Sequence, residues 1–410
     1  MTNTEFTNRP ESVDGRVAWR MVALLSVAEL LGMTLWFSAT AVAPSMIAEF
    51  RMTESQAAWL TMAVQAGFVA GTLASAALNL SDIINARWLF GACCLIGAAA
   101  NAAVAQASGP VEAVALRFAT GAALAGVYPP GMKIVAGWIA HQRGAALGLL
   151  VGALTLGSAF PHLLASIPGG SWRSVVLIAS SLAVVGGAIV VLLIGDGPHV
   201  TSTAPFNPHA AMRVFTRRAT RLALFGYLGH MWELYAMWTW IATFVAASVA
   251  LHEPASASRT GSLGAFLAIG SGALGCVMAG LLADRVGKAR VAAWSMMVSA
   301  TCAALTVIVF TLPPSVVFAL VIVWGFSIVA DSAQFSALVS QFSPRDYVGT
   351  ALTAQTCAGF LLTLLPIRLL PTIAVVVGWR WTFLVLLPGP MLGVLAMLGL
   401  MRGPQIVESR

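Results

Sequence analysis

The stretch that decides the fold is Gly280-Leu-Leu-Ala-Asp-Arg-Val-Gly-Lys-Ala-Arg290, which lies between two apolar runs at about 262–283 and about 290–312. Each run can cross a bilayer as a helix, since a span needs about 20 apolar residues. The charged stretch between them therefore predicts a short loop at one membrane face. We expect Gly287 to form the turn and Asp284 to accept hydrogen bonds from an adjacent helix N-terminus or nearby Arg side chains.

The composition of the whole chain extends this interpretation. Of the 410 residues, 59% are apolar and 9% are charged, and the mean hydropathy is +0.87. These values exclude an ordinary soluble domain and predict an all-α integral membrane protein. We expect about twelve helical spans, at residues 19–44, 56–78, 86–107, 111–138, 144–168, 172–194, 219–249, 261–283, 290–312, 315–341, 347–377 and 380–401.

The positions of the basic residues predict the orientation of the chain. The net charge of +7 could suggest a nucleic-acid partner, but the Lys and Arg residues lie mostly in short loops between apolar runs. Placing both termini in the cytoplasm leaves few of them on the outer side, namely Arg51, Arg173, Arg259 and Arg380. Because cytoplasmic loops are enriched in Lys and Arg, we predict an inner-membrane protein with both termini inside.

The two halves of the sequence repeat each other. Gly144…Pro161 matches Gly349…Pro366, and Trp172-Arg173 matches Trp379-Arg380, at an offset of about 205 residues. Such repeats are typical of transporters built from two related halves. We expect a six-helix unit at 1–194, a cytoplasmic linker at 195–218 and a second six-helix unit at 219–410.

The opening stretch, written Gly-x-x-x-Asp-Arg-x-Gly-Lys-x-Arg, resembles the loop signature of the major facilitator superfamily of secondary transporters. Arg117-Phe-Ala-Thr-Gly121 adds to the resemblance. Tyr128-Pro-Pro-Gly131…Trp138…Arg143-Gly144 is similar to branches that carry organic or inorganic anions. The resemblance implies twelve transmembrane helices in two pseudo-symmetric six-helix bundles around a central cavity. It also implies cytoplasmic gating loops containing Asp82, Arg87, Gly280, Asp284, Arg285, Gly287, Lys288 and Arg290.

Four titratable side chains within predicted spans are candidates for proton coupling: Glu29, His230, Glu233 and Asp331. An ion at the bilayer centre costs about 3 kcal/mol even on lenient scales, so such groups need partners, water or a function. His230 and Glu233 are three residues apart and share one helical face. We expect Glu29, His230 and Glu233 to lie near one another, the alternative being that the helix 7 pair only holds that helix to a neighbour.

Three cations within spans are candidates for binding an anionic substrate. Arg368 lies in a predicted cavity-lining helix, whereas Lys133 also fits a snorkelling role, and for Arg117 the resemblance implies gating or proton-linked coupling. Asp331, which shares a face with Gln334, is expected to be the counter-ion of Arg368 or Lys133. Aromatic residues complete the expected cavity, although Trp238 and Trp240 also fit an interfacial belt. The full substrate-binding set is Trp36, Arg117, Tyr128, Lys133, Trp232, Tyr235, Gln334 and Arg368.

These observations predict a proton-coupled secondary transporter of an organic anion that works by alternating access. The alternative is proton-linked efflux of amphipathic or cationic compounds, and a third class is a receptor that transports nothing. The sequence has no phosphate-binding loop, metal-ligand spacing or nucleophile–base motif, so we expect no enzyme activity, cofactor or metal. The expected partners are a small-molecule substrate, protons and the lipid bilayer, with the protein acting as a monomer and binding no nucleic acid.

Overall fold

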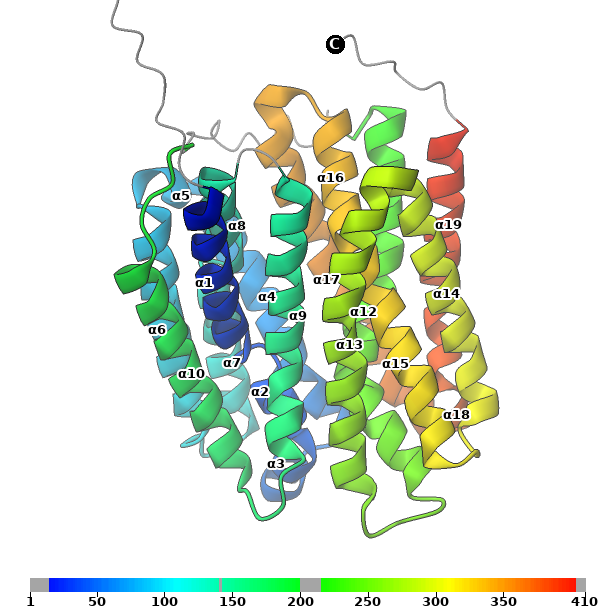
Figure 1. Ribbon diagram of the computed structural model, residues 1–410. Coiled ribbons are helices and arrows are strands. Elements are labelled where there is room, and N and C mark those ends of the chain that lie inside the picture. Colours follow the sequence, from blue (N-terminus) through cyan, green and yellow to red (C-terminus); the bar gives the residue numbers. More distant parts are fainter. Residues whose placement is uncertain (1–14, 140–141, 200–214, 403–410) are drawn as a thin grey trace, which may run out of the picture.

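The computed structural model describes residues 15–139, 142–199 and 215–402, and every regular element in these ranges is a helix (Figure 1). The first half of the chain forms α1 (Gly15–Met33), α2 (Ser38–Ala41), α3 (Ala43–Phe50), α4 (Glu54–Ala77), α5 (Leu80–Ile83), α6 (Ala86–Val104), α7 (Pro110–Leu124), α8 (Tyr128–Trp138), α9 (Arg143–Ala165) and α10 (Trp172–Leu193). The second half forms α12 (Arg218–Val249), α13 (Ala257–Val286), α14 (Lys288–Val309), α15 (Pro314–Ala330), α16 (Ser332–Phe342), η1 (Arg345–Tyr347), α17 (Val348–Val377), α18 (Trp379–Thr382), η2 (Phe383–Leu386) and α19 (Pro388–Met401). Most of the predicted 195–218 linker lies outside the described residues.

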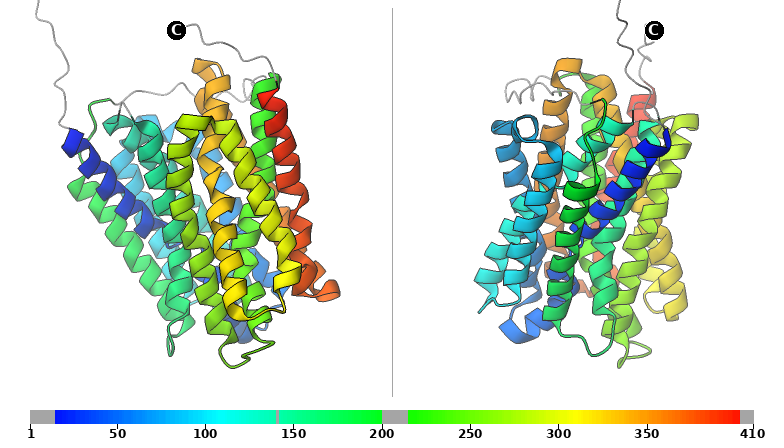
Figure 2. Two further views of the ribbon diagram at one scale, coloured as in Figure 1. Left: turned by 45° about the vertical axis from the view of Figure 1, so that its right-hand side comes forward. Right: turned by 60° about the vertical axis from the view of Figure 1, so that its left-hand side comes forward.

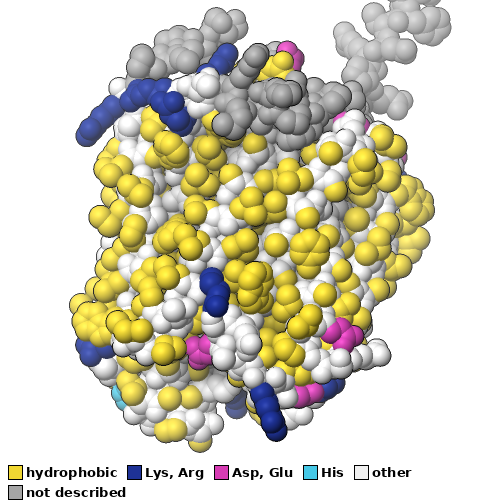
Figure 3. Space-filling model, turned by 180° about the vertical axis from the view of Figure 1, so that it is seen from behind, with side chains coloured by type: hydrophobic (Ala, Val, Ile, Leu, Met, Phe, Trp, Pro, Cys, Tyr) yellow, Lys and Arg dark blue, Asp and Glu magenta, His cyan; other side chains and the backbone are white. Residues whose placement is uncertain are grey.

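The surface of the molecule is that of a membrane protein. Ten segments of the described chain, each a helix or a pair of consecutive helices, are long and apolar enough to cross a bilayer. Large apolar side chains such as Val375, Leu192 and Leu392 are more than 60% exposed, and Figure 3 shows such side chains over the middle of one face. Lipid can cover this apolar band, whereas water would oppose its exposure.

Helices from the two halves of the sequence lie side by side. Figure 1 shows α1–α10 mainly on the left and α12–α19 mainly on the right, and Figure 2 shows the same helices from two further directions. The two groups meet where α9 packs along α13 and where α4 packs along α17. The start of α1 and the end of α19 lie at the same end of the molecule, at the top of Figure 1, and α3 lies at the opposite end.

Repeat-related glycines allow the closest helix contacts. A Cβ at Gly121 on α7 would overlap the carbonyl of Val64, and a Cβ at Gly325 on α15 would overlap the carbonyl of Ala268. Only glycine fits at such backbone approaches, which are common between membrane helices. The same packing device therefore recurs in both halves.

Repeat-related Trp-Arg pairs start α10 and α18. Arg173 Nε donates to the carbonyl of Ala105 at 2.9 Å, and Arg380 Nε donates to the carbonyl of Val307 at 2.9 Å. Each guanidinium thus binds a carbonyl at the C-terminal end of a preceding helix, Ala105 just beyond α6 and Val307 in the last turn of α14, where backbone acceptors lack intrahelical partners. Arg173 also binds Glu49 on α3, and together with the Trp172 indole it lowers the pKa of that exposed carboxyl to about 2.

Three predicted spans, at 19–44, 111–138 and 315–341, are broken. The proline pair of the second span predicts its break, whereas the breaks in the first and third correct the uninterrupted helices expected there. The first ends at Met33, the second is interrupted at Ala125–Val127, and the third at Asp331. Pro129 and Pro130 explain the second break, because each removes an N–H donor and its ring clashes with the carbonyl four residues earlier. The second and third breaks are related by the repeat, since Gly126 and Asp331 are 205 residues apart.

Candidate functional site

A layer of aromatic side chains lies where the two sequence halves meet. We call it the aromatic layer, and its members are Trp36, Phe37, Phe68, Tyr235, Trp238 and Phe360. The Trp36 ring is 5.1 Å from that of Phe68 on α4, 5.6 Å from that of Phe360 on α17 and 5.8 Å from that of Tyr235 on α12. The layer therefore joins helices that are far apart in the sequence.

Several polar groups in and around this layer are buried without a hydrogen-bond partner. Both indole N–H groups of the layer, at Trp36 and Trp238, are unpaired. So are both ring nitrogens of His162, which lies beside Phe37, and both amide atoms of Gln65, one turn from Phe68 on α4. Gln355 on α17 has the same property. Leaving one such group unpaired costs about 1–3 kcal/mol, so this concentration marks a functional region.

Arg117 on α7 holds the break after α1. Its guanidinium is fully buried and donates to the carbonyls of Leu35 and Trp36, to the carbonyl of Leu60 and to the side chain of Asn101. The break leaves the first two carbonyls without helical partners, and the planar fork of an arginine supplies donors in several directions. Arg117 thus positions Trp36 and Phe37. Its donors bind backbone carbonyls, whereas the sequence predicted that they would bind substrate.

Glu29 on α1 is completely buried, and neither carboxyl oxygen has a hydrogen-bond partner. Its Oε2 lies 3.0 Å from where a Cβ would stand at Gly131, just beyond the break between α7 and α8. Cys94 on α6 lies close by, since a Cβ at Gly32, one turn further along α1, would be 3.4 Å from Cys94 Sγ. Tyr128 is the first residue of α8. It lies close enough to Glu29 and to the tyrosines of α12, Tyr227 and Tyr235, to interact with them electrostatically.

Glu233 on α12 is equally buried but is hydrogen-bonded. Its Oε1 accepts from Ser299 Oγ on α14 at 2.7 Å and from Trp324 Nε1 on α15 at 2.8 Å. Its packing interface, between α12, α14 and α15, differs from that of Glu29, between α1, α6 and α8. The expected meeting of Glu29 and Glu233 at one interface is therefore wrong.

His230 forms its own cluster at the break between α15 and α16. Its Nδ1 lies 2.8 Å from Asp331 Oδ1, and its Nε2 lies 2.8 Å from Ser332 Oγ. Although His230 and Glu233 share a helical face as predicted, their side chains bind different partners. Asp331 pairs with His230, which corrects its expected pairing with Arg368 or Lys133, and Gln334 is buried on the next turn of α16.

A sequence signal could have related the two glutamates before the structure was known. Both lie in the pattern Glu-Leu-x-x-Met-x-x-Trp, at Glu29…Trp36 and at Glu233…Trp240, 204 residues apart. Ser299 of the second half corresponds to Cys94 of the first half at an offset of 205. The hydroxyl that donates to Glu233 thus corresponds to a thiol in the first half, and Glu233 also accepts from Trp324.

Two other expected substrate contacts lie away from the aromatic layer. Arg368 is exposed, and its Nη1 donates to the carbonyl of Ser55 at 3.2 Å, so the expected interior anion contact is wrong. Trp232 donates to the carbonyl of Val385 at 3.1 Å and packs against Gly389. Trp238 was expected in an interfacial belt, but it is 1% exposed and belongs to the layer.

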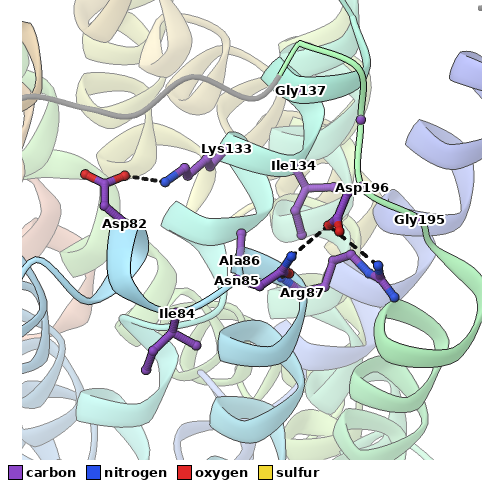
Figure 4. Close-up of a pocket in the computed structure, with 11 residues that line it drawn as sticks. Asp82, Ile84, Asn85, Ala86, Arg87, Lys133, Ile134, Gly137, Gly195 and Asp196 are labelled. Atoms are coloured by element: carbon purple, nitrogen blue, oxygen red, sulfur yellow. Dashed lines mark hydrogen bonds and ion pairs between the residues drawn. The ribbon is translucent and has the colours of Figure 1, made fainter.

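Lys133 belongs to a charged pocket at the end of the molecule where α1 begins. Its Nζ lies 2.5 Å from Asp82 Oδ1, whereas Arg87 and Asn85 both contact Asp196 (Figure 4). The two cations of the pocket therefore face two carboxylates, which leaves little net charge to attract an anion. Lys133 joins the predicted gating residues Asp82 and Arg87 in this place.

The second charged loop lies against α9. The Asp284 carboxylate oxygens are 3.7 and 3.8 Å from where a Cβ would stand at Gly144, in the first turn of α9, as expected for a carboxylate beside a helix N-terminus. Gly287 forms the turn with a φ of 97°, which confirms its predicted role, and Gly280 faces the carbonyl of Gly144 at ordinary distance. Arg285 and Arg290 are exposed, and Lys288 begins α14.

Sequence reasoning missed most of the unpaired neutral groups. Of the glutamines within spans it singled out Gln334 but neither Gln65 nor Gln355, and it named neither Phe360 nor His162 as a candidate site residue. A glutamine within an apolar span is the signal that could have identified Gln65 and Gln355.

Comparisons with known proteins agree with this geometry. The sequence profile of the Major Facilitator Superfamily matches residues 25–365. The structure is similar to the crystal structure of the nucleoside transporter NupG, with a TM-score of 0.70 and 15% identity, covering 94% of this chain and 100% of that one. It is also similar to an inward-facing bacterial homologue of the human lysosomal transporter Spinster, with a TM-score of 0.65 and 13% identity, covering 95% of each chain.

Proposed function

Because this chain belongs to the Major Facilitator Superfamily of transporters, we propose that it moves a small solute across the membrane by proton-coupled alternating access. In this proposal the protein has twelve spans in two repeat-related six-helix units, at 1–194 and 219–410, joined by the 195–218 linker. It works as a monomer in the inner membrane, with both termini in the cytoplasm. The protein is an integral membrane transporter and not an enzyme.

The observation that carries proton coupling is the contrast between Glu29 and Glu233. A carboxyl group buried without partners is far more stable neutral than charged, because desolvation penalises the ion. Glu29 therefore carries a proton in the packed state and loses it only when the interface between α1, α6 and α8 admits water. Glu233 is equally buried but differs in that Ser299 and Trp324 hold one of its carboxyl oxygens.

The His230–Asp331 pair gives the second half a different proton-sensitive element. Protonated His230 forms an ion pair that joins α12 to Asp331 at the break between α15 and α16, whereas neutral His230 forms none. We assign Glu29 the role of proton carrier and His230 with Asp331 the role of sensing its charge state. Glu233 is assigned to holding α12 against α14 and α15.

The charge distribution supports neither of the two substrate classes that the sequence left open. An organic anion needs an available interior cation, but Arg117 binds backbone carbonyls, Lys133 faces Asp82 and Arg368 is exposed. A cationic compound needs an acid in the aromatic layer, but Glu29 and Glu233 lie in other packing interfaces. The similarity to a nucleoside transporter is compatible with a solute that carries no net charge.

The test compares Glu29→Gln with Glu233→Gln in proteoliposomes that carry an imposed pH gradient. Each substitution mimics the protonated acid in shape and charge. We expect Glu29→Gln to abolish gradient-driven accumulation while it permits exchange of solute across the membrane, and Glu233→Gln to retain accumulation. Unchanged dependence on the pH gradient in Glu29→Gln would contradict the proposal.

A further inference from the structure

We propose that the aromatic layer binds an uncharged, planar, polar ring system, such as a nucleobase or a nucleoside. The inference rests on the proposed transport function and names the class of substrate. It follows from three properties of the layer and its immediate surroundings: its flat surfaces, its unpaired polar groups and its lack of charge.

The flat surfaces suit a ring, which would replace the ring-to-ring contacts that are buried in this conformation. Phe37 and Tyr235 lie nearly parallel, with ring centroids 6.3 Å apart and an interplanar angle of 10°. Trp36, Phe68 and Phe360 form a second group, with centroids 4.7–5.6 Å apart. Aromatic side chains stack on the flat face of a nucleobase, and aliphatic solutes gain less from such surfaces.

The unpaired polar groups specify hydrogen bonds around the edge of that ring. Trp36 and Trp238 supply N–H donors only, whereas Gln65, one turn from Phe68, supplies an amide with a donor side and an acceptor side. A glutamine amide matches heteroaromatic edges that carry an acceptor beside a donor. An apolar aromatic solute would leave all these groups unsatisfied, which binding sites built for hydrogen bonding reject strongly.

The lack of formal charge excludes ions as the preferred occupants. The six aromatic members and the neighbouring Gln65 carry none, and His162 is the one titratable side chain in the set other than Tyr235. The nearest guanidinium, that of Arg117, binds the carbonyls of Leu35 and Trp36 from within the packing of α1, α4 and α6. An ion placed in the layer would lose its hydration with no opposite charge to compensate.

Direct binding to the purified full-length protein in lipid nanodiscs tests the class. The probes are uridine and adenosine as uncharged planar solutes, orotate as the anionic counterpart, tetraphenylphosphonium as an aromatic cation, and glucose as an uncharged solute without an aromatic ring. Isothermal titration calorimetry should show binding of uridine or adenosine at least tenfold tighter than that of the other three. Preferred binding of orotate, tetraphenylphosphonium or glucose, or binding of no probe, would overturn the inference.

Variants locate the binding in the layer. Trp36→Phe and Trp238→Phe keep an aromatic ring and remove one N–H donor, so each should weaken nucleoside binding about 2- to 10-fold. Trp232→Phe is the matched control, because its indole N–H already donates to Val385, and it should leave binding unchanged. Equal weakening by all three variants would show that the layer is not the site.

Transport assays separate this inference from the proposed function. If orotate or glucose accumulates with the pH gradient while uridine and adenosine do not bind, the substrate class is wrong and proton-coupled transport stands. If a nucleoside binds in the layer but no pH gradient drives its accumulation, the site stands and the coupling proposal fails.

Discussion

At the residue scale, the chemistry of one side chain separates the repeat-related acids. Cys94 lies near Glu29 where Ser299 donates to Glu233. A thiol is a weak donor and a hydroxyl is a strong one, so the first half leaves its acid unsatisfied. This difference explains how two related glutamates in one chain acquire different roles.

Exchanging this side chain should move the behaviour of one acid toward that of the other. Cys94→Ser offers Glu29 a hydroxyl donor, which stabilises the charged carboxylate by roughly 1.5–3 kcal/mol if the bond forms. Because the charged carboxylate is stabilised, we expect Glu29 to lose its proton at lower pH. Transport assays should therefore show the half-maximal pH of proton-driven accumulation displaced downward. Cys93→Ser is the control, because Cys93 faces Gly126, and an identical displacement there would contradict the prediction.

The carboxylate of Glu49 gives a second prediction at this scale. Its pKa is lowered from 4.5 to about 2 by Arg173 and Trp172. A depressed pKa in the folded state contributes stability above the unfolded pKa, and this contribution is lost as the pH falls toward the folded pKa. Thermal unfolding of Glu49→Gln should therefore differ from wild type at pH 6 and converge with it between about pH 4.5 and pH 2. The difference in unfolding temperature should be small, because the Glu49–Arg173 pair is exposed. An equal difference at pH 6 and at pH 2 would contradict the assigned role of Glu49.

At the element scale, breaks in helices create the functional geometry. Arg117 stabilises the break after α1 through carbonyls that no helix satisfies, and this places Trp36 and Phe37 in the aromatic layer. The prolines after Ala125–Val127 place a second break beside Glu29, and Asp331 occupies the third. Broken helices are the usual way in which transporters bring backbone and side chains to a binding site.

Replacing the fork of Arg117 should therefore damage stability and binding together. Arg117→Lys keeps the charge but supplies a compact ammonium that cannot reach acceptors in several directions. We expect a loss of unfolding free energy of about 3 kcal/mol or more, from several charged hydrogen bonds, together with weaker nucleoside binding. Thermal unfolding and calorimetry in nanodiscs check both effects. Normal binding with reduced stability would limit Arg117 to a packing role.

The loop containing Asp284 gives a different prediction for an element. The carboxylate lies beside the N-terminus of α9 at an exposed position, so Asp284→Asn removes a charge–dipole interaction and little packing. Such interactions contribute about 0.3–1 kcal/mol. We expect nearly unchanged thermal stability and a several-fold change in transport rate, because only conformations with α9 and α13 in contact gain from the interaction. Wild-type transport rates in this variant would remove the loop from the gating mechanism.

At the scale of the whole molecule, contacts between the two sequence halves set the conformational balance. The Arg368 side chain joins α17 to α4 by its bond to the Ser55 carbonyl, at the end of the molecule opposite the charged pocket. At the pocket end, a Cβ at Gly349 would have nothing within 4 Å, whereas its repeat counterpart Gly144 faces Asp284. The Arg368 contact thus joins the two sequence halves at the end opposite the charged pocket.

Removing the Arg368 contact should open that end. A hydrogen bond of this kind contributes about 0.5–1.5 kcal/mol, which corresponds to a change of about 2- to 10-fold in a conformational equilibrium. In Arg368→Ala, spin labels at the exposed positions 56 and 372 should show a larger population of long distances than in the parent protein. Arg259→Ala, another exposed arginine, is the control. An unchanged distance distribution would show that this contact does not hold the two helices together.

The sequence by itself determined that the chain crosses a membrane, that it is helical, that its halves repeat and that its charged loops resemble those of one transporter superfamily. These properties depend on local composition and spacing, because a bilayer requires apolar helical spans and short charged connections. The sequence also found the buried acids, since charge within an apolar span is visible without a structure. Gly287 as a turn residue belongs to the same class of local property.

Only the tertiary structure decided which of these residues meet. Arg117, Lys133 and Arg368 formed one anion-binding set in the sequence, but helix breaks and packing place them with backbone carbonyls, with Asp82 and with Ser55. Each glutamate has a side chain near it from a helix about 65 residues further along the chain. Glu233 has the hydroxyl of Ser299, which donates to it, whereas Glu29 has the thiol of Cys94. Hydrogen bonding is directional and short-ranged, so a difference of a few ångströms between helices decides whether a buried group is satisfied.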